Sequence, residues 1–125
     1  MPNLTQLDGT VVTVDPDAAV RARQTFQHEP TDARAFLWAP KKLFLQETIE
    51  DVAAAISAEQ PAFTSLPTLS IPIWFDARRA GDALPPSVVL EMDGFLSMVF
   101  IDDVPQGSIL TVEALQALLD TARAA

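Results

Sequence analysis

The sequence predicts an α+β fold, in which antiparallel hairpins form a meander and two helices pack on one face of it. Three observations lead to this prediction. Short apolar segments alternate with turns rich in Gly, Pro and Asp through most of the 125 residues. The Asp-Gly dipeptides at 8–9 and 93–94 each lie between two such segments, as the turn of a hairpin does. Two further segments, each opened by a threonine, have apolar residues at helical spacing.

The first two strands are predicted on either side of an Asp-Gly turn. Residues 4–7 and 10–14 are short segments that favour extended structure. Both central residues of a type I′ hairpin turn need positive φ, and Asp8-Gly9 suits these positions. We therefore expect a hairpin that this dipeptide closes.

The next segment contains signals for both a helix and a strand. Residues 15–18 begin with Asp-Pro, which is a good helix start because the aspartate can cap free amides and proline fits the first helical position. Over residues 19–27, however, apolar residues alternate with polar ones, among them Arg21 and Arg23. We expect one helical turn over 15–18, followed by a strand whose arginines face water.

A second hairpin and the first helix follow. Residues 34–39 and 42–46 are apolar segments joined through Pro40-Lys41-Lys42, which predicts a turn. Thr48 can cap the helix expected at about Thr48–Ala58, and the acidic residues of its first turn suit the helix dipole. Apolar residues at positions i, i+3, i+4 and i+7 give this helix one buried stripe.

The second half contains strand signals that again end in a helix. Residues 71–75 alternate in polarity. Residues 88–100 carry the strongest hairpin signal of the chain, two apolar strands around Asp93-Gly94. Residues 102–108 are expected to turn the chain, and a second threonine-capped helix is predicted at Thr111–Ala124.

The chain length fits a single domain, although two small lobes that share a core, residues 1–58 and 71–125, are an alternative. Residues 59–70 are rich in Pro, Ser and Thr and form the connector between these lobes, either as a tether or packed into the core. Both halves end in a short strand that leads into a threonine-capped helix. This likeness is either a duplicated unit or a pair of generic strand–helix joints.

Composition excludes several classes of protein. The chain has 8 Lys and Arg against 17 Asp and Glu, and its net charge of −9 repels nucleic acid and anionic membranes. Its start lacks the pattern of a signal peptide, and no apolar run approaches the roughly 18 residues that span a bilayer. Cysteine is absent, which removes disulfides and thiolate metal sites. We expect an acidic cytoplasmic protein, from a bacterium by its Ala- and Arg-rich composition, without nucleic acid or membrane as partner.

Three motifs in the first half are shared with a known family. They are Leu-x-x-Leu-x-Gly at Leu4–Gly9, Pro-Thr-Asp at 30–32, and Pro-Lys-Lys-Leu-Phe-Leu-Gln-Glu-Thr-Ile-Glu-Asp-Val at 40–52. Residues 4–56 thereby resemble the small bacterial FlbD-type flagellar proteins, in which a Gly-Lys-Lys turn precedes a strand and an acidic helix start. Pro40 stands where that family has its turn glycine, and the second half has no counterpart. The resemblance implies a regulatory or assembly role in motility, and it supplies no catalytic residues.

Arg78 and Arg79 are the best candidates for binding a ligand. The two adjacent guanidinium groups lie beside an aromatic residue and a carboxylate, and they could clamp an anion through bidentate hydrogen bonds. Trp74 and the single histidine, His28, could complete the site. Alternatively, the arginines are solvated or bonded to nearby acids, His28 lies in an exposed loop, and Trp38 and Trp74 pack into the core.

Few residues are available for catalysis or for metal binding. The chain has four glycines and no Gly-rich phosphate loop, and no Gly-x-Ser-x-Gly motif. One histidine without cysteine gives no ligand spacing for a transition metal. Paired acids could act as acid and base or hold a cation, but turns and strand ends account for the candidates Glu91, Asp93, Asp102 and Asp103. We expect a non-catalytic protein without cofactor or metal.

The hydrophobic content of 49% and the mean hydropathy of +0.20 exceed what a monomer of this size needs. The excess either fills a dense core or is covered by a second subunit. We predict a small cytoplasmic interaction or regulatory module that forms a homodimer or binds another protein. Its candidate interface residues come from the strongest hairpin: Val88, Leu90, Leu96, Met98 and Phe100. The alternative is an anionic-ligand-binding protein or minor enzyme with its site around Trp74, Arg78, Arg79 and His28.

Overall fold

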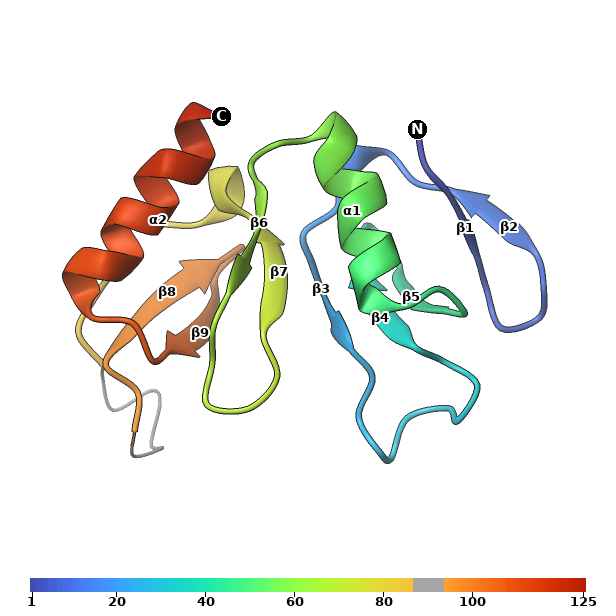
Figure 1. Cartoon of the computed structure of the whole chain (residues 1–125), viewed down its shortest axis with the longest axis horizontal. Helices are drawn as coiled ribbons and strands as arrows, with labels where there is room; N and C mark the ends of the chain where they lie inside the picture. The colour runs from blue at the N-terminus through green and yellow to red at the C-terminus, as the bar shows by residue number, and fades with distance from the viewer. Residues whose placement is uncertain (87–93) are drawn as a thin grey trace.

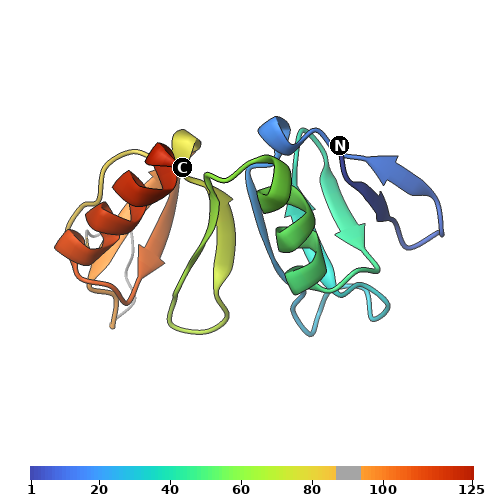
Figure 2. The same cartoon turned by 45° about the horizontal axis from the view of Figure 1, so that its top comes forward.

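The computed structural model describes residues 1–86 and 94–125 (Figure 1 and Figure 2). In chain order its elements are β1 (Asn3–Thr5), β2 (Val11–Thr13), the 3-10 turn η1 (Pro16–Ala18), β3 (Arg21–Gln24), β4 (Ala35–Trp38), β5 (Lys42–Leu45), α1 (Ile49–Glu59), β6 (Phe63–Leu66), β7 (Ile73–Asp76), the 3-10 turn η2 (Ala77–Arg79), β8 (Ser97–Ile101), β9 (Val104–Ser108) and α2 (Val112–Ala124). Antiparallel strands together with two helices confirm the predicted α+β class.

One five-stranded sheet contains strands from both halves of the chain. Its order is β5-β4-β3-β7-β6, and every neighbouring pair is antiparallel. The β1–β2 hairpin adjoins β5 through a bridge between Gln6 and Leu45. The β8–β9 hairpin adjoins the segment 80–84, because bridges join both ends of this segment to β8. The β1–β2 hairpin and the β8–β9 hairpin therefore lie at opposite ends of the molecule (Figure 1).

Each helix covers a hydrophobic core of its own, and both helices lie toward the viewer in Figure 1. α1 buries Val52 and Ile56 against strands of the first half, and α2 buries Leu115 and Leu119 against strands of the second half. Burial of apolar surface at roughly 25 cal/mol per Å² is the main source of stability for both cores.

Strand β7 lies between the two cores. The side chain of Trp74 packs against the core of α1 and stacks on Phe63, with 6.4 Å between the ring centroids. Phe75, the next residue, belongs to the core of α2, because successive side chains of a strand point to opposite faces. Val20, just before β3, also lies in this second core. The halves therefore share strand pairing and core residues.

Both helix starts are confirmed. Thr48 caps α1 by accepting a hydrogen bond from the Asp51 amide at 3.2 Å, and Thr111 caps α2 in the same way at 3.1 Å. Asp15 caps η1, which begins with Pro16 as predicted. These interactions link residues two or three positions apart, so they form wherever the local sequence is present.

Two strands were not predicted from the sequence. Residues 63–66, within the predicted connector 59–70, form β6 in the five-stranded sheet, so the connector is packed rather than a tether. Residues 104–108 form β9 and pair with β8, whereas the sequence predicts a turn there. The β8–β9 hairpin turns at Asp102-Asp103, both of which have positive φ (46° and 65°). The hairpin predicted around Asp93-Gly94 falls largely on residues 87–93, which lie outside the described residues, as do the candidates Glu91 and Asp93.

The turn of the first hairpin also differs from the prediction. Gly9 has φ of 86°, but Asp8 does not have the positive φ that a type I′ turn requires. The Gln6 amide donates to the carbonyl of Thr10 at 2.9 Å, so three residues form the loop. The carboxylate of Asp8 instead accepts hydrogen bonds from the Thr10 amide and hydroxyl.

The prediction that Arg21 and Arg23 face water is wrong. Arg23 donates to both carboxylate oxygens of Glu29, at 2.7 and 3.1 Å, and its guanidinium lies 3.9 Å from the ring centroid of Phe26. The Nε and Nη2 atoms of Arg21 are buried, and no acceptor among the described residues bonds them. Burial lowers the pKa of Arg21, and the charge of Asp102 opposes this change.

Within the described residues, the two halves have corresponding elements in the same order, with the bridged segment 80–84 in the place of β3. β1, β2, η1, β3, β4, β5 and α1 are followed by β6, β7, η2, the segment 80–84, β8, β9 and α2. Corresponding residues have corresponding roles: Asp15 and Asp76 cap the 3-10 turns, and Thr48 and Thr111 cap the helices. The likeness noticed at the two strand–helix joints therefore extends over both halves as a structural repeat.

Candidate interaction site at the free sheet edge

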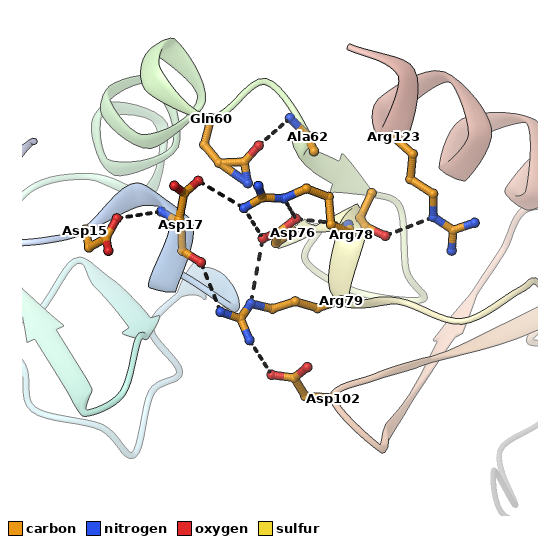
Figure 3. Close-up of polar contacts among 10 residues, drawn as sticks. Asp15, Asp17, Gln60, Ala62, Asp76, Arg78, Arg79, Asp102 and Arg123 are labelled. Carbon is orange, nitrogen blue, oxygen red and sulfur yellow. Dashed lines mark hydrogen bonds and ion pairs between the residues drawn. The ribbon is translucent and has the colours of Figure 1, made fainter.

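Arg78 and Arg79 lie in a network of charges between the two halves (Figure 3). Its centre is Asp76, whose side chain is 1% exposed. Arg78 donates from Nε and Nη2 to the two oxygens of this carboxylate, at 3.1 and 3.0 Å, and its backbone amide donates at 2.9 Å. Arg79 Nε lies 3.7 Å from the same carboxylate. The bidentate fork of Arg78 is thus occupied by a carboxylate of its own chain.

The same arginines reach across to the first half. Arg78 forms an ion pair with Asp17 at 3.1 Å, and Arg79 donates to the carbonyl of Asp17 at 3.0 Å. Arg79 also bonds Asp102 in the β8–β9 turn at 3.2 Å. The arginines therefore hold η1 and η2 together next to the β3–β7 pair.

Burial of Asp76 by itself would raise the pKa of its carboxyl group. The hydrogen bonds from the side chain and the backbone of Arg78 outweigh this effect, and the pKa is lower than usual. The carboxylate raises the pKa of Arg78 in return. Both groups remain charged, because the buried carboxylate of Asp76 keeps its hydrogen bonds and the side chain of Arg78 is still 45% exposed to water.

The other two predicted ligand residues lie elsewhere. Trp74 packs against the core of α1, and His28 stacks on Phe26 in the loop after β3, with 5.8 Å between the ring centroids. The structure therefore brings Arg78 and Arg79 together but places neither Trp74 nor His28 in their network. An anion site at these arginines stays a prediction, and it would require Arg78 to exchange Asp76 for the ligand.

The predicted interface residues have different environments. Met98 is 1% exposed, Leu96 is 53% exposed, and Phe100 is half-buried. Val88 and Leu90 lie outside the described residues. Met98 contributes to the interior beside the segment 80–84, whereas Leu96 is available at the surface. Whether Leu96 and Phe100 contact a partner stays a prediction.

The edge strand β2 has outward-facing backbone groups. Val14 donates to the carbonyl of Pro2, and Gln6 donates to that of Thr10. In this register Val12 is bonded to Leu4, because bonded and non-bonded pairs alternate along an antiparallel ladder. The amides and carbonyls of Val11 and Thr13 therefore point away from β1. No described strand pairs with them.

An apolar groove of about 310 Å³ lies beside this edge. β2 forms one wall, and the β4–β5 turn forms the other. The residues that line it are Val12, Thr13, Val14, Asp15, Ala18, Ala39, Pro40, Lys41 and Leu43. We call this feature the β2 groove. An unpaired strand edge next to apolar side chains is a typical place for another chain to add a strand.

The structural repeat shows what fills the corresponding place in the second half. There β7 takes the position of β2, and β3 pairs along its outer edge. The space between β7 and the β8–β9 turn contains Val20, Arg21 and Trp38 of the first half, and about 40 Å³ remain. At the same place in the first half, none of the described strands pairs with β2.

No local pattern of the sequence indicates this site. Each residue of the groove has an ordinary local explanation as a strand or turn residue, and only the repeat distinguishes the occupied edge from the free one. The aspartates that cap the two 3-10 turns, Asp15 and Asp76, are a local signal of the repeat in addition to the two threonine-capped strand–helix joints.

Within residues 1–86 and 94–125, no group of three or more His, Cys, Asp or Glu side chains is arranged to hold a metal ion. No helix in these ranges is long and apolar enough to cross a membrane.

Comparison with known proteins gives no family for the chain. No family model matches it, and neither curated proteins nor solved structures give a significant match. The resemblance of residues 4–56 to FlbD-type flagellar proteins therefore stays an untested prediction.

Proposed function

We propose that the protein is a small, non-catalytic interaction module of the cytoplasm, which binds a segment of polypeptide along the free edge of β2. One observation carries the proposal. The outer edge of β7 is paired with β3, and the equivalent edge of β2 is unpaired beside an apolar groove. Two equivalent strand edges thus differ in one respect: β7 is paired along its outer edge, whereas no described strand pairs along that of β2.

Edge pairing supplies enough interaction for recognition. A strand added at β2 would satisfy the outward backbone groups of Val11 and Thr13, and its side chains would cover the groove. Val11 is 64% exposed, so covering it would remove apolar surface from water. The charged network at Asp76 needs no reactive role, because each of its arginines holds a carboxylate of the fold.

Amide hydrogen exchange on the monomer tests whether the edge is open. We expect fast exchange at Val11 and Thr13, whose amides face outward, and slow exchange at Val12 and Val14, whose amides bond β1. Slow exchange at all four amides would mean that the edge is already covered and would contradict the proposal.

Light scattering on a sizing column, over a concentration series, tests whether a second copy is the partner. Thr13→Pro removes an outward amide and leaves the backbone bonds to β1 in place. Thr13→Val keeps that amide and is the matched control, because both changes remove the hydroxyl that donates to Asn3 Oδ1. A dimer that Thr13→Pro abolishes would use β2. A dimer that tolerates this change would place the contact elsewhere, for example at Leu96.

A further inference from the structure

We infer that the β2 groove takes an extended segment of a different protein, with aliphatic side chains facing the groove and a Lys or Arg beside Asp17. This inference rests on the proposed function and adds the chemistry of the partner. It follows from the β3–β7 pair, which shows within the same chain how a strand sits on such an edge.

The β3–β7 pair fixes the register of the added strand. Asp76 donates its amide to the carbonyl of Val20 at 3.0 Å, and Ala22 lies opposite Trp74. Asp15 corresponds to Asp76, since each caps its 3-10 turn by accepting a hydrogen bond from the amide two residues further on, that of Asp17 or of Arg78. The partner would therefore accept from the Asp15 amide and then pair along Thr13 and Val11.

The side chains around the two places differ, and the differences predict the partner. In the second half Arg21 lies against Ile101 and Asp102 in the filled groove. The β4–β5 turn has Pro40 and Lys41 where the β8–β9 turn has its two aspartates. An arginine at that position would meet an apolar ring and a like charge, so an aliphatic side chain fits better.

The charges beside η1 are reversed relative to η2. Arg78 of η2 forms an ion pair with the carboxylate of Asp17, which lies just before β3, the strand that pairs with β7. The corresponding position in η1 is Asp17 itself, with its side chain 71% exposed. A partner with Lys or Arg three residues before its first paired residue would therefore complement Asp17. The net charge of −9 also favours a basic segment.

A second copy of the chain fits the groove poorly. Antiparallel pairing of two β2 strands would bring Asp8 of one copy close to Asp15 and Asp17 of the other, and like charges across strands are destabilising. The segment 80–84, the equivalent of β3, is already bonded: Arg123 donates to the carbonyls of Ala80 and Gly81 at 2.7 and 2.6 Å. Gln116 accepts from the Ala83 amide at 2.9 Å.

The test uses two synthetic peptides and the full chain labelled with ¹⁵N. The parent peptide has the sequence of residues 17–25, which contains β3. The designed peptide carries Asp17→Lys and Arg21→Val in that sequence. We expect the designed peptide to shift the amide signals of Val11, Thr13 and Asp15, and the parent to bind roughly tenfold more weakly. Thr13→Pro should abolish the shifts, and Thr13→Val should retain them.

The outcomes separate this inference from the proposed function. Equal affinity for the two peptides, or no shift with either one while the Val11 and Thr13 amides exchange fast, would overturn the partner chemistry and leave the open edge intact. A dimer that Thr13→Pro disrupts would overturn it in favour of a second copy. Protected edge amides in the monomer would overturn the proposed function itself.

Discussion

Individual charged residues connect the halves of this protein. Asp76 begins as the cap of a 3-10 turn, a role that any aspartate before such a turn can fill. Its position between two arginines makes it the centre of an ion network that reaches Asp17 and Asp102. Asp76 thus caps a local turn and also helps to hold the two halves of the chain together.

Replacement of Asp76 by asparagine tests this network. Asp76→Asn keeps the cap but leaves Arg78 and Arg79 without the buried charge, so we expect a loss of about 2–3 kcal/mol in the free energy of unfolding at neutral pH. Denaturant titration measures it. Asp17→Asn is the control, because its ion pair is exposed and contributes less than about 1 kcal/mol. Equal losses in the two variants would contradict a central role for Asp76.

The same variant predicts a pH dependence. The pKa of Asp76 is lower in the folded protein than in the unfolded chain, so its ionised form favours the fold. This contribution is complete above the ordinary pKa of aspartate and is lost as the pH falls through the folded pKa. We expect the stability difference between the natural chain and Asp76→Asn to shrink on acidification below about pH 4. A difference that stays constant down to pH 2 would contradict the assignment.

At the scale of elements, β9 depends on a contact that a local reading of the sequence does not show. Its residues Val-Pro-Gln-Gly-Ser favour a turn, and proline is usual only near strand ends or edges. In the fold, the ring of Phe95 covers Gly107: a Cβ built there would lie 2.6 Å from the ring. The aromatic ring thus packs where the glycine lacks a side chain.

A pair of glycine substitutions tests this packing. Gly107→Ala should displace Phe95 and lower the free energy of unfolding by about 1–3 kcal/mol. Gly81→Ala, where a Cβ meets nothing within 4 Å, should be neutral or stabilising by up to about 1 kcal/mol. Thermal unfolding of both variants measures the difference. Equal effects would mean that Phe95 does not depend on the missing side chain.

At the scale of the whole molecule, two cores share one sheet. Val20 of the first half lies in the second core, and β7 has one side chain face in each core. Trp38 is the last residue of β4. Trp74 belongs to β7 of the second half, but its ring packs against the first core and stacks on Phe63. Trp38, for which the sequence suggested core packing, is 36% exposed, with the Lys42 ammonium 5.4 Å from its ring centroid.

We expect the two halves to unfold together. Leu119→Ala in the second core should cost about 2–5 kcal/mol, because it leaves a cavity where the side chain is fully buried. The transition followed by tryptophan fluorescence should then shift as far as the one followed by circular dichroism. Leu118→Ala, at a half-buried position on the same helix, should shift both less. An unshifted fluorescence transition would show two independently unfolding lobes.

Local interactions were predictable from the sequence alone. The capped helices, the 3-10 turn at Pro16 and the hairpin of β4 and β5 depend on residues close together in the chain. Local sequence patterns therefore predict them. Strands β6 and β9 were not predicted, because their own residues favour loops. Backbone hydrogen bonds from a neighbouring strand, β7 for β6 and β8 for β9, keep them extended.

What the sequence determined by itself is the α+β class, the two helices with their threonine caps, and the net negative charge. Only the tertiary structure decided which strand edges meet. The pairing of β3 with β7, the ion pair of Arg78 with Asp17 and the edge of β2 that no described strand pairs each depend on residues far apart in the chain. The energy of such contacts comes from backbone groups and apolar surfaces that become neighbours only when the whole sheet is assembled.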